Sequence, residues 1–445
     1  MFIRACLGLL LLVPIAAWPQ RDLNGTEANT DPPDTAPLQT PPPVSGAAYS
    51  TDFVSETQAN TLRASLAFSA AYSNNVQGTT TPIPSASYSI WPTIAFDTAT
   101  TRLQWRLNYS PGFTFYQRVS ALNQGNQNFV TDFQYRLTPR TTVSLRDSFQ
   151  KTNNPLNQSN PAAATLVSGS LPAPGISVIT PVADQLYNAA NAELKYQFSA
   201  EGMVGATGTF TNLYYPDPAE ARGLFDSNST GGSVFYSQHL HNRYYVGGSY
   251  QYQTISAYRV GTNVGTETQL QTIFGFFTVA IKPTLTLSLS GGPQHSNTTQ
   301  PLLPASESWS PMFMASLGWQ GQRTSLAASY SRAVTGGGGL AGAYHSNNAT
   351  LSGKWQVSRT WNAQLSAGYS DLKNLSALFS VASPGGHSWS GTISFSRPLG
   401  EHLSAQLGYT RIQQSFAGIT STSAIPDANR EFVTISYQFV RPLKR

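Results

Sequence analysis

Apolar and polar residues alternate along this chain in short segments that recur from about residue 62 to residue 439. The segment 101–110 reads TRLQWRLNYS, in which every second residue from Leu103 to Tyr109 is apolar and the residues between them are polar. An extended chain points successive side chains to opposite faces, so this pattern predicts a strand with one apolar and one polar face. It returns at 133–137, 192–198, 285–290, 361–369, 402–409 and 434–439. No stretch of comparable length has helical spacing, and we therefore predict an all-β fold.

The connections between these segments alternate between short and long. Short ones lie at 97–101, 138–140, 199–202, 239–242, 282–283, 320–323, 358–360 and 397–402, and long ones include 151–188, 291–308 and 371–386. Counting hairpins gives about 18 strands, with about 16 equally compatible, because strand boundaries read from sequence carry errors of a few residues. A closed barrel of this size has a lumen that side chains do not fill. We predict an antiparallel up-and-down barrel over residues 61–445, with its polar faces toward a water-filled lumen.

The composition indicates what the apolar face meets. Charged residues make up 11% of the chain, whereas they are about 25% of an ordinary soluble domain. The abundance of Ser, Thr, Gly and Asn is too high for a bundle of membrane helices. A closed barrel leaves no unpaired sheet edge, which is a condition for β-structure in hydrocarbon. We therefore predict a transmembrane β-barrel whose apolar face contacts lipid.

The first residues have the layout of an export signal. Arg4 precedes an apolar run from Ala5 to Val13, and the small residues Ala16 and Ala17 follow. This is the order of a secretory signal peptide, whereas a membrane helix needs about 20 apolar residues. We predict a signal peptide at 1–19 and a disordered, Pro-rich periplasmic segment at 20–60.

Two classes of site are disfavoured by residue content. The only cysteine is Cys6 in the predicted signal, so the exported chain would have no disulfide and no Cys-based metal or redox site. The formal net charge is +5, but the basic residues are scattered singly, which disfavours nucleic-acid binding.

Candidate catalytic and metal motifs are weak. The sequence GHSWSG at 386–391 resembles a hydrolase nucleophile elbow around Ser388, but Ser390 replaces the second glycine and the pattern predicts no following helix. His239 and His241 lie in a short connection without neighbouring carboxylates. The glycine run 336–339 lacks the Lys and Ser/Thr of a phosphate-binding loop and is predicted to be a flexible loop. We predict no enzymatic activity, no cofactor and no metal.

Aromatic and basic side chains gather near the predicted strand ends. Amphipathic rings are suited to the membrane interface, and we assign this role to Trp105, Trp319, Trp355, Trp361 and Trp389, with Trp91 and Trp309 also near inferred ends. Basic residues lie at or beside seven of the eight short connections: Arg102, Arg140, Arg243, Lys282, Arg323, Arg359 and Arg397. These basic side chains either keep the connections soluble or extend to the phosphates of the lipid headgroups.

With these features the chain resembles the bacterial outer-membrane β-barrel class and, within it, porin-like channels. Short turns at one end and long loops at the other are typical of that class. The segment EFVTISYQF (431–439) resembles its C-terminal recognition strand, although Val440 to Arg445 follow where such chains usually end. The resemblance implies outer-membrane localisation, short turns on the periplasmic side, and assembly by the barrel-assembly machinery.

Charged residues of one parity are predicted to line the lumen. In a simple register around Pro139, Asp132 falls opposite Arg146, close enough for an ion pair, and Arg106 shares their face on the preceding strand. Charges along a water-filled pore set its ion preference. The full predicted set is Arg106, Asp132, Arg136, Arg146, Glu193, Lys195 and Lys354, in which basic residues are in excess. Register locking without a role in transport is an equal alternative for Asp132 and Arg146.

The function that we predict is a passive channel for small polar or anionic solutes. The segment 151–188 either folds inward and narrows this channel, as a comparable loop does in porins, or caps its mouth. Alternatives are a conduit for polysaccharide export and a surface adhesion or structural barrel with an occluded lumen. Sugar-binding sites along the lumen would favour the conduit. The predicted partners are therefore membrane lipid and small polar solutes.

Overall fold

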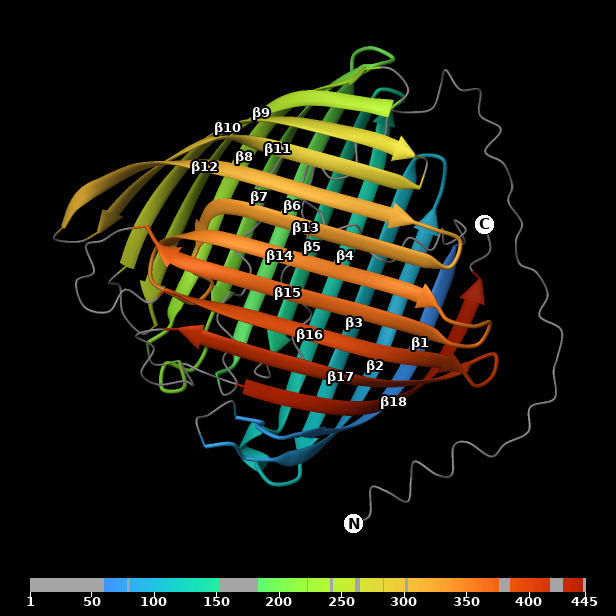
Figure 1. Cartoon of the computed structure of the whole chain (residues 1–445). Coiled ribbons are helices and arrows are strands. Elements are labelled where there is room, and N and C mark those ends of the chain that lie inside the picture. The colour runs from blue at the N-terminus through green and yellow to red at the C-terminus, as the bar shows by residue number, and fades with distance from the viewer. Residues whose placement is uncertain are drawn as a thin grey trace. The chain divides into compact units, whose positions relative to one another are not determined.

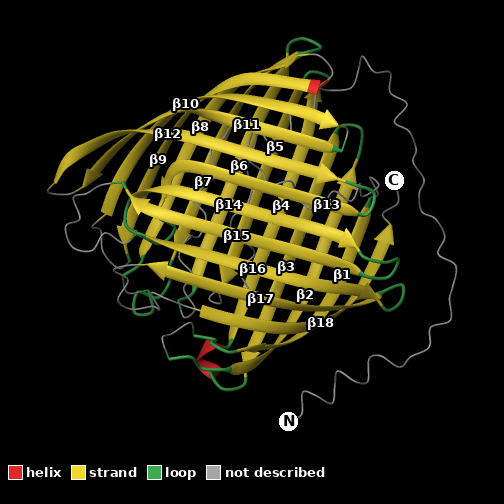
Figure 2. Ribbon diagram, in the orientation of Figure 1, coloured by secondary structure: helices red, strands yellow, loops and turns green. Residues whose placement is uncertain are grey.

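A computed structural model describes residues 60–77, 81–152, 183–221, 223–240, 243–260, 265–282, 284–300, 303–375, 385–416 and 427–442. They form an 18-stranded sheet in which strands neighbouring in sequence are paired (Figure 1). Figure 2 shows how completely strands dominate. The predicted signal peptide and Pro-rich segment lie outside the described residues, as do residues 153–182 of the long predicted loop. No helix in the described ranges is long and apolar enough to span a membrane.

The strands are long enough to cross a bilayer. The first nine are β1 (Thr61–Ser73), β2 (Ser85–Ala99), β3 (Leu103–Tyr116), β4 (Gln124–Thr138), β5 (Thr141–Thr152), β6 (Gln185–Gln197), β7 (Gly202–Tyr214), β8 (Phe225–Leu240) and β9 (Tyr244–Arg259), with a 3-10 turn η2 (Ser120–Leu122) before β4. The remainder are β10 (Gly265–Lys282), β11 (Leu285–Gln300), β12 (Leu303–Gln320), β13 (Thr324–Gly336), β14 (Ala343–Gln356), β15 (Asn362–Asn374), β16 (Gly386–Pro398), β17 (Leu403–Phe416) and β18 (Asp427–Pro442).

The sheet closes on itself because β1 pairs with both β2 and β18. The β1–β18 seam is antiparallel and runs from Thr61 opposite Pro442 to Ser73 opposite Arg430. Closure satisfies the backbone groups of the first and last strands, which an open sheet would leave unpaired. The predicted closed antiparallel barrel and the count of 18 strands are confirmed.

The two ends of the barrel differ as the sequence predicts. Each of the eight short connections joins two strands at one end, which we call the turn end. We call the opposite end, where the other connections lie, the loop end. Two details of the prediction are wrong. Residues 291–308 are mostly strand, since β11 extends to Gln300 and β12 begins at Leu303. Val440 to Pro442 continue the last strand instead of following it.

The alternation of side chains separates an outer face from a lumen face. Large apolar residues stand exposed on every second position, as Val433, Ile435 and Tyr437 do on β18. Their cross-strand partners on β1 are Ala70, Phe68 and Leu66, which continue the same apolar surface. Since the period of a strand is two, the polar positions between them face the lumen.

β12 and β13 are paired over less than half the length of β12. These strands pair only from Phe313 opposite Arg332 to Gln320 opposite Ser325, at the turn end. Toward the loop end, β12 pairs in the described residues with β11 alone, and Figure 1 shows β11 and β12 running on past the end of β13. Pro311 lies just beyond the last pair and has no N–H to donate, which accounts for the end of pairing there.

Candidate functional site

The predicted charged residues lie on the lumen face, six of them on β3–β6 and the seventh, Lys354, on β14. Arg106 on β3 is opposite Asp132 on β4, and Asp132 is in turn opposite Arg146 on β5. The neighbouring outward positions of β3 and β4 carry aromatic rings such as Trp105 and Phe133. The register therefore brings together three of the predicted residues on adjacent strands. By the same parity, Arg136, Glu193, Lys195 and Lys354 also belong to the lumen face.

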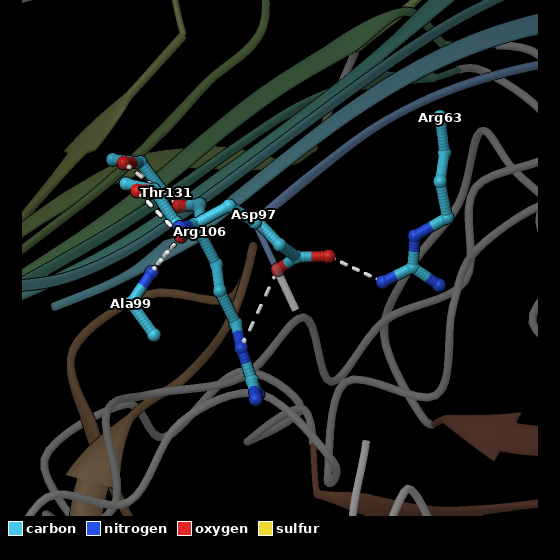
Figure 3. A network of polar contacts seen from close by, with 7 residues as sticks. Arg63, Asp97, Ala99, Arg106 and Thr131 are labelled. Carbon is cyan, nitrogen blue, oxygen red and sulfur yellow. Dashed lines mark hydrogen bonds and ion pairs between the residues drawn. The ribbon is translucent and has the colours of Figure 1, made fainter. Parts of the chain in front are cut away.

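An ion-pair network joins β1, β2 and β3 near the turn end. The carboxylate of Asp97 contacts the guanidinium of Arg63 and lies 3.5 Å from Nε of Arg106, so two cations share one anion (Figure 3). The side chain of Arg106 is 67% exposed, whereas that of Asp97 is 18% exposed. The lumen at this level is therefore open to water on the side that Arg106 faces. Arg63 and Asp97 were not among the predicted lumen residues, although the alternation of each strand places them on the lumen face.

The ion pair expected between Asp132 and Arg146 is not formed among the described residues, although the two are directly opposite. The guanidinium of Arg106, which shares a face with both, turns toward Asp97 instead. A long arginine side chain reaches several carboxylates from one position, so register alone does not select its partner. This part of the wall thus carries two arginines, Arg106 and Arg146, on either side of Asp132.

A second ionic contact lies on β6. The Glu193 carboxylate is 3.0 Å from Nζ of Lys195 and accepts a hydrogen bond from the Ser144 hydroxyl on β5 at 3.2 Å. Glu193 is buried, so its charge is shielded from the lumen by these two partners. The lumen face of β1–β6 carries more basic than acidic residues. The acidic ones are Asp97, Asp132 and Glu193, and the basic ones are Arg63, Arg106, Arg136, Arg146 and Lys195. The balance on this wall is cationic.

The predicted interface tryptophans lie at strand ends. Trp105 donates its Nε1–H to Thr131 at 3.1 Å, and Trp319 and Trp355 are exposed near the turn end. Trp361 lies in the connection before β15, with Arg397 over its ring at 5.6 Å. Trp389, near the loop end, donates to Gln413 at 2.9 Å and stacks with Arg411 at 5.3 Å.

Trp91 differs from the other tryptophans. It belongs by register to the lumen face in the middle of β2, so its assignment to a strand end is wrong. Its ring covers Gly112 on β3 so closely that a Cβ there would lie 2.3 Å from it. The glycine makes room for the ring.

The loop end of the lumen is packed by the connection between β13 and β14. We call residues Gly336–Ala343 the hairpin tip; all of them are buried. Leu340 is 1% exposed and belongs to an apolar cluster with Tyr187 of β6 and Leu372 of β15. The carbonyl of Gly339 also accepts a hydrogen bond at 2.9 Å from the N–H of Phe225, where β8 begins. The tip therefore crosses the lumen from β13–β14 toward β6–β8.

The hairpin tip departs from the sequence prediction in one respect. The glycine run was predicted to be a flexible loop, but contacts with distant strands bury it. Gly338, Gly339 and Gly342 have φ of 55°, 106° and 84°, a backbone region that favours glycine. The tight turn thus depends on the glycines that make the sequence resemble a flexible loop.

Lumen-face side chains of β10, β12 and β13 pack against one another. Phe274, Phe276, Met312 and Met314 form a buried cluster with Ala333. On β1–β5 the lumen positions near the turn end remain accessible, as Arg106 shows. The lumen face of β1–β6, which we call the charged wall, therefore has positions that water reaches.

Electrostatics at the loop end differ from those of the charged wall. The pKa of Glu220 is raised by burial and by the neighbouring Asp217 and Asp184. Asp184 also lies 3.4 Å from Nζ of Lys151. No group of three or more His, Cys, Asp or Glu in the described ranges is arranged to hold a metal. His241 lies outside the described residues.

The elbow-like sequence around Ser388 has no turn. Gly386–Gly391 forms the start of β16, and Ser388 pairs with Ser370 of β15 and Gln414 of β17. The sharp strand-to-helix turn that exposes a nucleophile is not formed at this position.

Comparison with known proteins shows likeness only at the level of solved structures. No protein-family model and no curated protein matches the chain. The siderophore receptor PirA of Pseudomonas aeruginosa is 13% identical with a TM-score of 0.41, over 85% of this chain and 80% of that one. From the same organism, OccK3 (OpdO) is 10% identical with a TM-score of 0.40, over 85% and 96%. OccK2 (OpdF) is 9% identical with a TM-score of 0.42, over 86% and 98%.

Proposed function

We propose that this chain is an outer-membrane channel through which small polar solutes diffuse passively, with a preference for anions and with no reaction catalysed. The observation that carries the proposal is the cationic balance of the lumen wall on β1–β6, where Arg106 is largely exposed to water. A charged wall in a narrow aqueous passage raises the local concentration of counter-ions, which sets selectivity.

The orientation that we propose places the turn end in the periplasm and the loop end outside. Short periplasmic turns and long external loops are the rule for such barrels. Basic residues at the turns, such as Arg140 and Arg323, would then lie near the phosphates of the inner leaflet. The charged wall is at this periplasmic end, whereas the hairpin tip narrows the external end.

Single-channel conductance of the refolded protein in a planar bilayer under a salt gradient tests the proposal. We expect stable conductance steps and a reversal potential with the sign of anion preference. Arg106→Ala and Arg146→Ala should move that potential toward zero, because each removes a lumen charge. Arg411→Ala is the matched control, since Arg411 lies over Trp389 on the outer face and should leave the potential unchanged.

One observation favours a second function. The buried hairpin tip and the apolar cluster around Leu340 obstruct the loop end, as expected of a structural or adhesion barrel with an occluded lumen. The same measurement separates the two, since protein that is folded and inserted but silent contradicts the channel and supports the occluded barrel.

A further inference from the structure

We propose that the hairpin tip is a gate, which leaves the lumen when the end of β13 pairs with the free edge of β12. The inference rests on the proposed channel function. In the structure the tip lies inside the lumen, and the gate is closed. In the second state β13 covers the free edge of β12 and the loop end of the lumen is wider.

The free edge of β12 matches the strand that would cover it. In the described residues, Leu303–Met312 of β12 pairs with β11 only, and Ala333–Gly336 of β13 pairs with β14 only. The register that sets Phe313 opposite Arg332, continued toward the loop end, sets Met312 opposite Ala333 and Ser310 opposite Thr335. An unpaired edge is a template for pairing with an extended strand, and β13 is the nearest one.

A side chain takes the place of the missing strand pairing in the closed state. The Gln294 amide on β11 accepts a hydrogen bond from the N–H of Val334 at 2.7 Å and donates one to its carbonyl at 3.5 Å. Gln294 is fully buried. These bonds satisfy the backbone of β13 at the point where it leaves β12, so they hold the tip inward.

The closed state also buries polar groups that lack partners. The hydroxyls of Tyr215, Tyr344 and Thr266 are buried without a hydrogen bond. Tyr215 and Tyr344 belong to the same apolar cluster as Leu340, and Thr266 lies against Gly342 of the tip. Movement of the tip would admit water to these groups, which offsets the loss of apolar contacts.

The open state has a cost of its own. Pro311 would face Val334 in the continued register and donates no hydrogen bond, so the new pairing is incomplete. The glycines of the tip permit the change of backbone direction that the movement requires. Two arrangements of similar free energy are what a gating element needs.

The experiment is a reversible cross-link that traps the open state. Ser310→Cys and Thr335→Cys are combined in a chain whose one cysteine, Cys6, is replaced by serine. The two positions face each other only in the continued register. Oxidation is therefore expected to lock the gate open and to at least double the conductance. A reductant should reverse this increase. The matched control is Ser316→Cys with Ser329→Cys, a pair that is already opposite and of the same parity, whose oxidation should not change conductance.

A second variant tests the gate without a cross-link. Gln294→Ala removes the bonds that hold the tip, and the time spent in the higher conductance level should rise about tenfold. Folding of each variant is checked by its heat-modifiable migration on a gel.

The outcomes separate the gate from the channel. If the control disulfide forms but the 310–335 disulfide does not, or forms without a change in conductance, the gate is wrong and the channel stands. If every folded and inserted variant is silent in both redox states, the channel proposal fails, and the gate with it.

Discussion

Arg106 and Asp97 lie opposite each other on β3 and β2, with Nε of Arg106 3.5 Å from the Asp97 carboxylate. Asp132 is equally opposite Arg106 on the other side, yet it makes no such contact. Since Asp97 also contacts Arg63, one carboxylate reduces the field of two lumen arginines. We therefore expect the selectivity of the proposed channel to depend on an acidic residue as well as on the basic ones.

Asp97→Asn should make the channel more selective for anions. The substitution keeps the shape of the side chain but removes the charge that screens Arg63 and Arg106, so the anion-to-cation permeability ratio should rise about two- to threefold. Reversal potentials under a salt gradient measure it. Glu431→Gln on the outer face of β18 is the control, and an equal shift there would mean that the effect does not arise in the lumen.

Lysine at two consecutive positions of β17 should have opposite consequences. Leu407 stands exposed on the outer face between Phe395 and Val433, and Leu407→Lys should lower the free energy of unfolding by about 2–4 kcal/mol, since a charge enters the hydrocarbon. Gln406 has the opposite parity, and Gln406→Lys should cost less than about 1 kcal/mol. Denaturant unfolding in lipid vesicles compares them. Equal losses would contradict the assignment of the outer face to lipid.

The faces of the strands were predictable because one rule governs them. With a period of two, a residue such as Arg146 is placed on the lumen face once a single apolar neighbour is placed outside. The choice between Asp97 and Asp132 as the partner of Arg106 was not predictable, because both lie directly opposite it. That choice depends on side-chain rotamers, which the pattern does not contain.

Other parts of the structure depend on contacts between distant segments. Residues 291–308 have the Gly, Pro, Asn and Ser content of a loop, but ladders on neighbouring strands hold most of them extended. The burial of the hairpin tip depends on Leu340 meeting Tyr187, far away in sequence. Local composition carries no information on either contact, so both segments were predicted to be loops.

Gly112→Ala should destabilise the barrel through Trp91. The new Cβ would lie 2.3 Å from the indole ring, which must move, so we expect a loss of about 1–3 kcal/mol in the free energy of unfolding. Gly208→Ala is the control, because nothing lies within 4 Å of a Cβ there. Gly112→Ala combined with Trp91→Ala should cost less than the sum of the two changes. Additive losses would show that the ring is not the cause.

Removal of residues 440–445 should weaken the seam of the barrel. Val440, Arg441 and Pro442 are opposite Arg63, Leu62 and Thr61, so the deletion leaves the start of β1 paired with β2 alone.

Because Arg63 also holds Asp97, the same deletion should lower both the folded fraction after refolding and the denaturant midpoint, and it should alter ion selectivity. Removal of 443–445 alone takes away none of these pairs and is the matched control. Heat-modifiable migration on a gel gives the folded fraction, and fluorescence gives the midpoint. If both truncated chains have the folded fraction and the denaturant midpoint of the full chain, the pairs beyond Phe439 contribute nothing to the stability of the closed barrel.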